Sequence, residues 1–136
     1  LEYERKVQNG EKVISIHIPS DADLSDEALD SSLERVRALL RKNFPDFENA
    51  PFVCDSWMLH ESLKNYLNES SRILRFQARF DLKKQYWNAN NYLPFVFNRA
   101  DCSDYAKLPE NTSLQRKMKA HLLNGGSIGS GYGVLK

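Results

Sequence analysis

The sequence predicts an α/β (α+β) fold, a mixed β-sheet with flanking helices in the order β(β)αβαββαβ. Three observations carry this prediction. Apolar and polar residues alternate in several short segments, as in strands with one exposed face. In other segments apolar residues recur every three or four positions, as in helices that cover a sheet. The length of 136 residues suits a single domain around one core.

A β-hairpin is expected at the start of the chain. Lys12–Pro19 alternates isoleucine with polar residues, and Leu1–Val7 can pair with it across Asn9-Gly10, a dipeptide that suits a tight turn. A helix then begins at Ser25, whose hydroxyl can accept hydrogen bonds from first-turn amides, and ends at Phe44-Pro45-Asp46. Its buried stripe is expected at Leu29, Leu33, Val36, Leu40 and Phe44.

The middle of the chain predicts further strands. Phe52–Cys54 is a short buried strand, which we expect to lie parallel to Lys12–Pro19 because a helix connects the two. Residues 59–70 follow a helical period. Leu74–Leu82 has the clearest alternation, and we expect it to pair antiparallel with a return strand at Leu93–Phe97.

A final helix and strand complete the predicted fold. Thr112 and Gln115 form a capping box at the start of the helix, and Asn124-Gly125 ends it. The glycine spacing in Gly126–Gly131 follows a helix instead of opening one, so we interpret it as a turn and not as a phosphate loop. This turn leads to an edge strand at Tyr132–Leu135.

Composition and charge exclude several classes of function. A net charge of +1 attracts neither nucleic acid nor a membrane, and we expect neither as a partner. No apolar run reaches the roughly 18 residues of a membrane-spanning helix. Cys54 and Cys102 lie far apart, which favours free thiols in the cytoplasm, and no residue set has the spacing of metal ligands. Because the chain begins at Leu1 and not at Met, we expect a fragment of a longer protein.

Four short segments carry a resemblance to a known family: Ile16–Pro19, Phe52–Trp57, Ile73–Gln77 and Leu108–Arg116. Together they resemble the C-terminal, GNAT-like domain of bacterial proteins named as acyltransferases, which are similar to N-acetyltransferases. The resemblance implies a GNAT-like fold for residues 1–136, with acetyl-CoA or another acyl-CoA as the acyl donor. It also implies that the N-terminal region of the same protein is missing here.

The loop that binds the CoA pyrophosphate in GNAT enzymes is altered in this chain. That family uses an R/Q-x-x-G-x-G/A loop, whose backbone amides surround the phosphates at a helix N-terminus. The corresponding segment, Ser20–Glu27, has no glycine and no basic residue, and five acids occur by Asp30. Like charges about 4 Å apart repel by roughly 4 kcal/mol at an effective dielectric constant of 20. We therefore expect the fragment to bind acetyl-CoA weakly or not at all.

Candidate catalytic residues follow two strands that we expect to be neighbours. His17 points away from the isoleucine face and can act as a general base toward an amine; the alternative is a structural, hydrogen-bonded histidine. Asp55 and Ser56 end the next strand on the same side, and the alternative is that one of them caps the following helix. A nucleophile with its base among Cys54, Ser56 and His60 is a further interpretation, but spacing does not reveal its geometry.

The candidate ligand-binding residues are Trp57, Arg75 and Arg79. Trp57 follows the same strand and either borders a ligand or belongs to the core. Arg75 and Arg79 share the exposed face of their predicted strand and can contact an anion; the alternative is that they pair with acids. The turn at Tyr86–Asn91 is exposed enough to serve as a contact surface.

Three functions remain open from the sequence. The first is an acyl-CoA-dependent acyltransferase whose acceptor site is completed by the missing N-terminal region. The second is a non-catalytic module that binds a small-molecule ligand or a partner domain. The third is a purely structural half of a larger protein, with an exposed sheet edge that the missing N-terminal region covers. If there is a site, we expect it to be concave and bordered by His17 and Asp55–Trp57, with Arg75 or Arg79 nearby.

Overall fold

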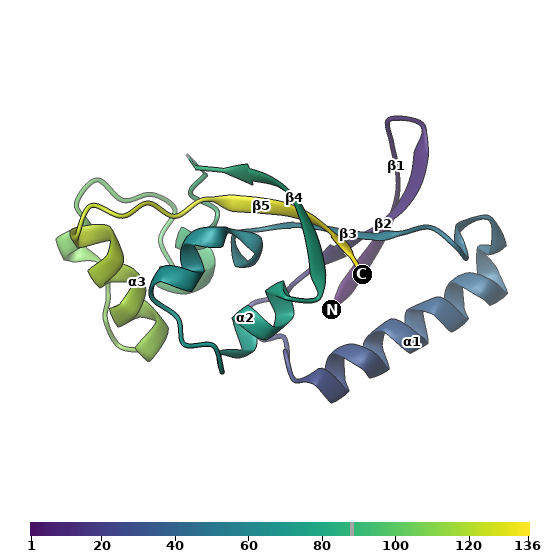
Figure 1. Ribbon diagram of the computed structural model, residues 1–136, viewed down its shortest axis with the longest axis horizontal. Helices are drawn as coiled ribbons and strands as arrows, with labels where there is room; N and C mark the ends of the chain where they lie inside the picture. The colour runs from purple at the N-terminus through teal and green to yellow at the C-terminus, as the bar shows by residue number, and fades with distance from the viewer. Residues whose placement is uncertain (88) are drawn as a thin grey trace.

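Five strands form one mixed sheet in the computed structural model, which describes residues 1–87 and 89–136 (Figure 1). The strand order is β1-β2-β3-β5-β4, and helices flank the sheet. This architecture confirms the predicted fold class. The strands are β1 (Glu2–Gln8), β2 (Glu11–His17), β3 (Phe52–Ser56), β4 (Phe80–Tyr86) and β5 (Ser130–Leu135).

The predicted hairpin is present as β1 and β2. Seven residue pairs join the two strands, the first of them Glu2 with His17. Asn9 and Gly10 have φ angles of 51° and 81°, the left-handed values that a two-residue hairpin turn requires. The turn projects away from the rest of the molecule (Figure 1).

Helix α1 (Asp26–Asn43) begins and ends as predicted. The Ser25 hydroxyl accepts a hydrogen bond from the Ala28 amide, and the amide of Phe44 donates to the carbonyl of Leu40 at the other end. The predicted apolar stripe faces the sheet and packs in one cluster with the isoleucines of β2 and with Phe52. The helix lies along one side of the sheet (Figure 1).

Strand β5 occupies the interior of the sheet, so the prediction of an edge strand in the tail is wrong. It lies between β3 and β4 and pairs antiparallel with both. Glycine lets β5 pack against the turn that follows β3, because a Cβ atom at Gly131 would lie 2.3 Å from the carbonyl oxygen of Leu59. As predicted, β2 and β3 are parallel neighbours.

The predicted strand Leu74–Leu82 is wrong in its first half. Residues 72–77 form helix α2 (Arg72–Gln77), capped by the hydroxyl of Ser71, and β4 starts only at Phe80. The alternation of apolar and polar residues predicted a strand here because Gln77 was expected to be exposed. Gln77 is buried, and its amide donates to the carbonyls of Met58 and His60.

Two further predicted elements are also wrong. Leu93–Phe97 is a π-helical turn and not a return strand, because Leu93 and Phe97 are buried against α3, and β5 pairs with β4 instead. Residues 59–70 form short 3-10 turns, Trp57–Leu59 and Glu61–Asn65, instead of a helix. The predicted turn at 86–91 includes Asn88, which lies outside the described residues.

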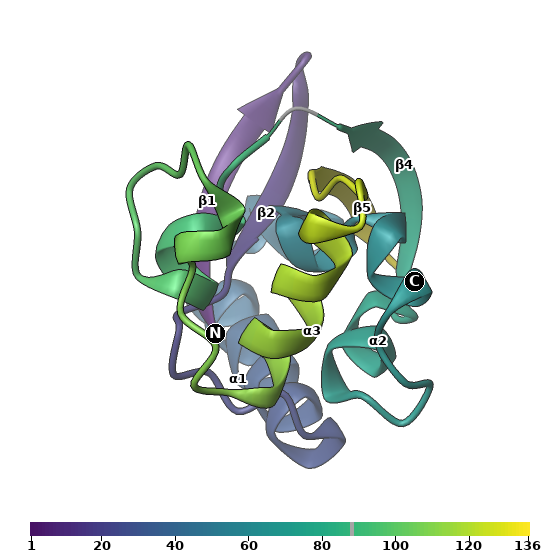
Figure 2. The same cartoon turned by 90° about the vertical axis from the view of Figure 1, so that its left-hand side faces the viewer.

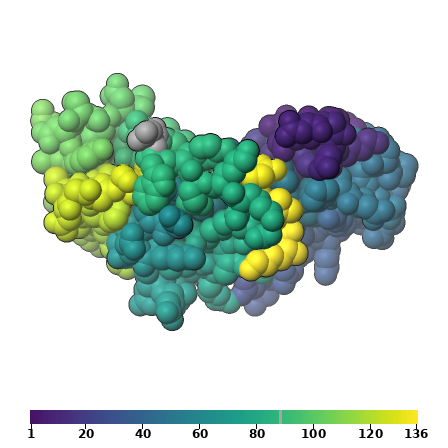
Figure 3. Space-filling view, turned by 45° about the horizontal axis from the view of Figure 1, so that its top comes forward, coloured from purple at the N-terminus to yellow at the C-terminus, as the bar shows by residue number. Residues whose placement is uncertain are grey.

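Helix α3 (Ser113–Leu123) has the predicted capping box between Thr112 and Gln115 and ends before Gly125, whose φ is 85°. Among the described residues it packs in a second hydrophobic cluster, beside the one that α1 forms with the sheet. Met58 contacts both. The α3 end faces the viewer in Figure 2, with α1 behind it, and the β1–β2 hairpin lies at the opposite end in Figure 3.

Candidate functional site

The pairing between β2 and β3 stops before either strand ends. Only two residue pairs join them, Ile14 with Phe52 and Ser15 with Val53, although β2 continues to His17 and β3 to Ser56. A cavity of ≈ 130 Å³ lies where the two strands separate. Residues 16–18 and 54–58 line it, together with Asn91 and Phe95. We call this cavity the β2–β3 opening.

The structure brings four of the predicted site residues together at the β2–β3 opening. His17, Asp55, Ser56 and Trp57 all line it, as expected for residues at the carboxyl ends of parallel neighbouring strands. Asn91 and Phe95 were missed, because the segment that carries them was assigned to a turn and a return strand. The chemical roles of the four residues stay predictions.

His17 is half-exposed and is not held by a backbone carbonyl. Its Nε2 atom lies 2.9 Å from a carboxylate oxygen of Glu4, on the neighbouring strand β1. The hydrogen bond from His17 lowers the pKa of Glu4, since it stabilises the ionised carboxylate. A carboxylate on one ring nitrogen orients an imidazole and stabilises its charged form, as a general base requires. The same contact also serves as a cross-strand pair in the hairpin.

Asp55 is exposed and belongs to a row of three hydrogen-bonded side chains. The Ser130 hydroxyl donates to Oδ1 of Asp55 at 2.8 Å, and Nδ2 of Asn91 donates to the Ser130 oxygen at 3.2 Å. Ser130 is buried at the start of β5. No local sequence signal points to Ser130 or Asn91, because β5 reaches β3 only through the folded sheet.

The structure does not assemble the nucleophile suggested for Cys54, Ser56 and His60. The Ser56 hydroxyl accepts from the Met58 amide at 3.1 Å and so caps the turn after β3, which was the alternative for this residue. Cys54 is buried, and desolvation together with the charge of Asp55 raises its pKa to about 12. His60 is also buried, and its Nδ1 atom is hydrogen-bonded to Ser62. Trp57 is 4% exposed and packs in the second cluster while it lines the opening.

Arg75 and Arg79 do not lie on one strand face, and neither lines the β2–β3 opening. Both contact the first turns of α1. Arg75 pairs with Asp26, and Arg79 binds Asp26 at 2.9 Å and Asp30 at 2.8 Å. Hydrogen bonding to Arg79 lowers the pKa of Asp26. Pairing with acids, the alternative interpretation, is therefore what these arginines do.

The N-terminus of α1 has its own acceptors. Oδ1 of Asp23 accepts from the Ser25 amide at 2.9 Å, and this hydrogen bond lowers the pKa of Asp23. The Ser25 hydroxyl accepts from the Ala28 amide at 3.4 Å. A phosphate group would have to displace these acceptors and approach several carboxylates. The residues present therefore do not fit a pyrophosphate at this helix end.

A metal site and a membrane-spanning segment are two further features that concern function, and the structure describes residues 1–87 and 89–136. Within these ranges no cluster of three or more His, Cys, Asp or Glu side chains is arranged to hold a metal ion. In the same part of the chain, no helix has both the length and the apolar character that crossing a membrane requires.

Comparison with known proteins places these features in context. Residues 2–135 match the family described as GNAT-like C-terminal domain. A search of the curated proteins found no match. The crystal structure of an acyltransferase in complex with decanoyl-CoA is similar, with a TM-score of 0.85 and 28% identity over 98% of this chain and 43% of that chain.

Two more solved acyltransferase structures are similar. One is in complex with CoA and 10C-teicoplanin (TM-score 0.85, 28% identity, 98% of this chain and 44% of that one). The other is a mutant in complex with octanoyl-CoA (TM-score 0.81, 28% identity, with the same two coverages). The present chain thus spans less than half the length of the chains that it matches.

Proposed function

The chain belongs to the family of GNAT-like C-terminal domains, and from this membership we propose that it is the donor-binding part of an acyl-CoA-dependent acyltransferase. The observation that carries the proposal is the β2–β3 opening, with its two residue pairs followed by a lined cavity. The similar structures with bound decanoyl-CoA and octanoyl-CoA support an acyl-CoA as the donor.

The opening suits an extended arm that carries amide groups. Beyond Ser15 and Val53, the facing edges of β2 and β3 have no strand-to-strand partner, and such edges bind an added extended chain through backbone hydrogen bonds. Apolar side chains of the wall, from Ile16, Ile18 and Phe95, can contact methylene groups. The pantetheine arm of CoA has this combination of amides and methylenes. Its bound thioester would supply the acyl group.

The nucleotide end of CoA does not fit the N-terminus of α1, because its first turn is acidic and the cap is already formed: Asp23 accepts from the amide of the capping residue Ser25, and the Ser25 hydroxyl accepts from the Ala28 amide. We therefore propose that this chain recognises the thioester arm and not the pyrophosphate. This part of the proposal explains why the usual glycine-containing loop is absent while the strand opening is kept.

His17 is the proposed general base, with Asp55 beside it at the β2–β3 opening. As an acceptor amine attacks the thioester carbonyl, a C–N bond forms, the C–S bond breaks, and the nitrogen loses a proton to the imidazole. The Glu4 carboxylate, 2.9 Å from Nε2, stabilises the charged ring until the proton passes to the departing thiolate. Ser56 acts here only by capping the turn that follows β3.

The proposal is tested by comparing donors in calorimetric titrations of the chain. S-decanoylpantetheine should bind within about threefold of decanoyl-CoA, since the nucleotide adds few contacts here. The nucleotide part alone, adenosine 3′,5′-bisphosphate, serves as the control and should not bind measurably. If decanoyl-CoA binds more than about tenfold more tightly than S-decanoylpantetheine, the chain holds the pyrophosphate and the proposal is wrong.

The occupied N-terminus of α1 favours one alternative, a non-catalytic module that binds a small molecule or a partner domain. Such a module would still bind S-decanoylpantetheine at the β2–β3 opening. Acyl transfer by a protein that carries this domain and its remaining region separates the two functions, because only an enzyme would lose transfer when His17 is replaced.

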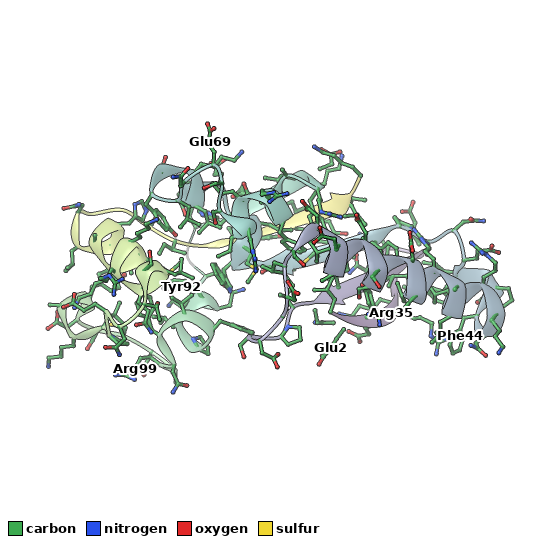
Figure 4. All side chains as sticks on the ribbon, turned by 90° about the horizontal axis from the view of Figure 1, so that it is seen from below. Glu2, Arg35, Phe44, Glu69, Tyr92 and Arg99 are labelled. Carbon is green, nitrogen blue, oxygen red and sulfur yellow. The ribbon has the colours of Figure 1, made fainter. Side chains whose placement is uncertain are left out.

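We also propose that the further region present in the similar chains covers the free edge of β1. A groove of ≈ 410 Å³ lies between β1 and α1, and Tyr3, Val36 and Leu39 are among its apolar lining residues. In Figure 4, Arg35 of α1 and Phe44, which follows that helix, lie on the same side of the molecule as Glu2 of β1. Slower hydrogen exchange of β1 amides in the longer protein would support this placement, and unchanged exchange would contradict it.

The expected cellular setting also stays a proposal. Both cysteines are free, which supports a reducing compartment such as the bacterial cytoplasm.

A further inference from the structure

Asp55 borders a second cavity, on the side of β4 and β5. This cavity has a volume of ≈ 490 Å³ and is lined by Asp55, Tyr86, Trp87, Ala89, Asn91 and Ser130. We call it the Trp87 cavity. It shares Asp55 and Asn91 with the β2–β3 opening, so the two cavities meet at these side chains.

The aromatic wall of the Trp87 cavity is open to a ligand. Tyr86 is 44% exposed and Trp87 is 47% exposed. Trp87 is nevertheless held in place, because it forms a T-shaped contact with the buried ring of His60, with 4.4 Å between ring centroids and an interplanar angle of 85°. An exposed indole that is held in place is the usual partner of a flat or ring-shaped ligand.

The polar side of the cavity carries the carboxylate of Asp55. Ser130 and Asn91 orient the Asp55 carboxylate through the hydrogen bonds described above. Other acids such as Asp26 and Asp81 pair with arginine or lysine. In residues 1–87 and 89–136, no lysine or arginine forms an ion pair with Asp55. The carboxylate is thus available to a cation from solution.

We infer that the Trp87 cavity is the acceptor subsite and takes a primary amine borne on a ring. The inference rests on the proposed acyltransferase function. The ring would lie on Trp87 and the ammonium group on Asp55, because a carboxylate beside an aromatic face selects a cation that also has an apolar surface. Asp55 would then hold the nitrogen where the two cavities meet. On transfer, the ammonium first releases one proton to water; the neutral amine then attacks the thioester carbonyl, the C–N bond forms and the C–S bond breaks, and the second proton passes through His17 to the thiolate. The products are an amide, a thiol and one released proton.

The subsite is tested by NMR of the indole N–H groups during titration with cyclohexylamine. The chain has two tryptophans, and Trp57 is 4% exposed, so a bound ring should move the Trp87 signal and leave the Trp57 signal in place. Cyclohexanol, which lacks the charge, and methylammonium, which lacks the ring, should each bind at least about tenfold more weakly. Equal binding of cyclohexanol would show that Asp55 does not select the amine and would overturn the inference.

Paired variants separate the contribution of the Asp55 charge to amine binding from that of the Trp87 ring. Asp55→Asn should abolish the preference for cyclohexylamine over cyclohexanol, whereas Asp81→Asn, at an exposed acid of β4 outside the cavity, should leave it unchanged. Trp87→Ala should remove binding of the ring, whereas Tyr105→Ala, at an exposed aromatic residue elsewhere, should not. The inference is wrong if Asp81→Asn has the same effect as Asp55→Asn. It is also wrong if Tyr105→Ala has the same effect as Trp87→Ala.

Donor binding distinguishes failure of this inference from failure of the proposed function. Trp87 is not among the described residues that line the β2–β3 opening, so Trp87→Ala should bind S-decanoylpantetheine as the unaltered chain does. Donor binding without amine binding would overturn the acceptor subsite alone. Amine binding without donor binding would overturn the acyltransferase proposal and leave an amine-binding cavity.

Discussion

The two edges of β3 differ in how far each one pairs with its neighbouring strand. On one side, β3 pairs with β5 through four residue pairs, from Val53 with Val134 to Ser56 with Gly131. On the other side, it pairs with β2 through only two and then separates from it. The first edge is closed by β5, whose Gly131 packs against the turn that follows β3. The second edge opens beyond Ser15 and Val53, although β2 continues to His17. A single strand therefore contributes to stability through one edge and, in the function that we propose, to donor binding through the other.

The closed edge should give the largest effect when it is disturbed. Gly131→Ala places a methyl group 2.3 Å from the carbonyl oxygen of Leu59, and we expect it to lower the free energy of unfolding by about 3 kcal/mol. The control is Gly10→Ala, where no atom lies within 4 Å and only the φ of 81° opposes the change, at about 1 kcal/mol. Urea denaturation measures both. Equal losses would show that β5 does not need glycine at this position.

At the open edge, a change in activity is expected without a comparable change in stability. In a protein that carries this domain and its remaining region, His17→Ala should reduce the rate of acyl transfer about a hundredfold. Because His17 is half-exposed, the melting temperature should fall by no more than about 2 °C. A large fall in melting temperature with normal transfer would leave His17 as a structural partner of Glu4.

The acids after the open edge should disfavour the intact cofactor. We expect calorimetry of this chain with acetyl-CoA to detect weak binding or none, because the first turn of α1 is acidic and the Ser25 hydroxyl already accepts from the Ala28 amide. A micromolar dissociation constant would contradict this expectation. Binding by the longer protein but not by this chain would show that the donor site is divided between them.

The ion pairs that hold α1 against α2 and β4 should make stability depend on pH. The pKa of Asp26 lies below its ordinary value of 3.8, because Arg79 stabilises the carboxylate. Its contribution is therefore present above pH 4 and is lost as the pH falls through the lowered pKa. Urea denaturation at pH 5 and pH 3 should show a smaller acid-dependent loss for Arg79→Met than for the unaltered chain. Identical losses would mean that this pair contributes nothing to folding.

The smallest effect is expected at Cys54, which lies in the open edge but is buried. Its pKa of about 12 leaves almost no thiolate at pH 8, so iodoacetamide should modify the partly exposed Cys102 first. Peptide mass spectrometry measures the order of modification. Faster labelling of Cys54 would mean that the β2–β3 opening admits solvent much more freely than the structure indicates.

The predictable parts of the fold are those fixed by neighbouring residues. The Asn9-Gly10 turn, the Ser25 cap and the Thr112 capping box each depend on contacts within a few positions, and each is present. The failures depend on distant contacts. Gln77 is buried because it binds carbonyls near β3, and β5 enters the sheet because its glycines fit beside residues far away in the sequence.

The distinction between local and distant contacts also applies to the residues of the candidate site. His17 and Asp55–Trp57 could be expected to meet, because residues that follow parallel neighbouring strands share one edge of the sheet. Ser130 could not be predicted as a partner of Asp55, since their contact requires β5 to lie beside β3.

The central claim, that β3 binds the donor through one edge only, is tested most directly by backbone NMR during titration with S-decanoylpantetheine. The account predicts that the amide signals of residues 16–18 and 54–56 shift together and saturate, while those of residues 133–135, in the half of β5 away from the opening, stay in place. Shifts confined to the first turn of α1, or absent from residues 16–18, would contradict it.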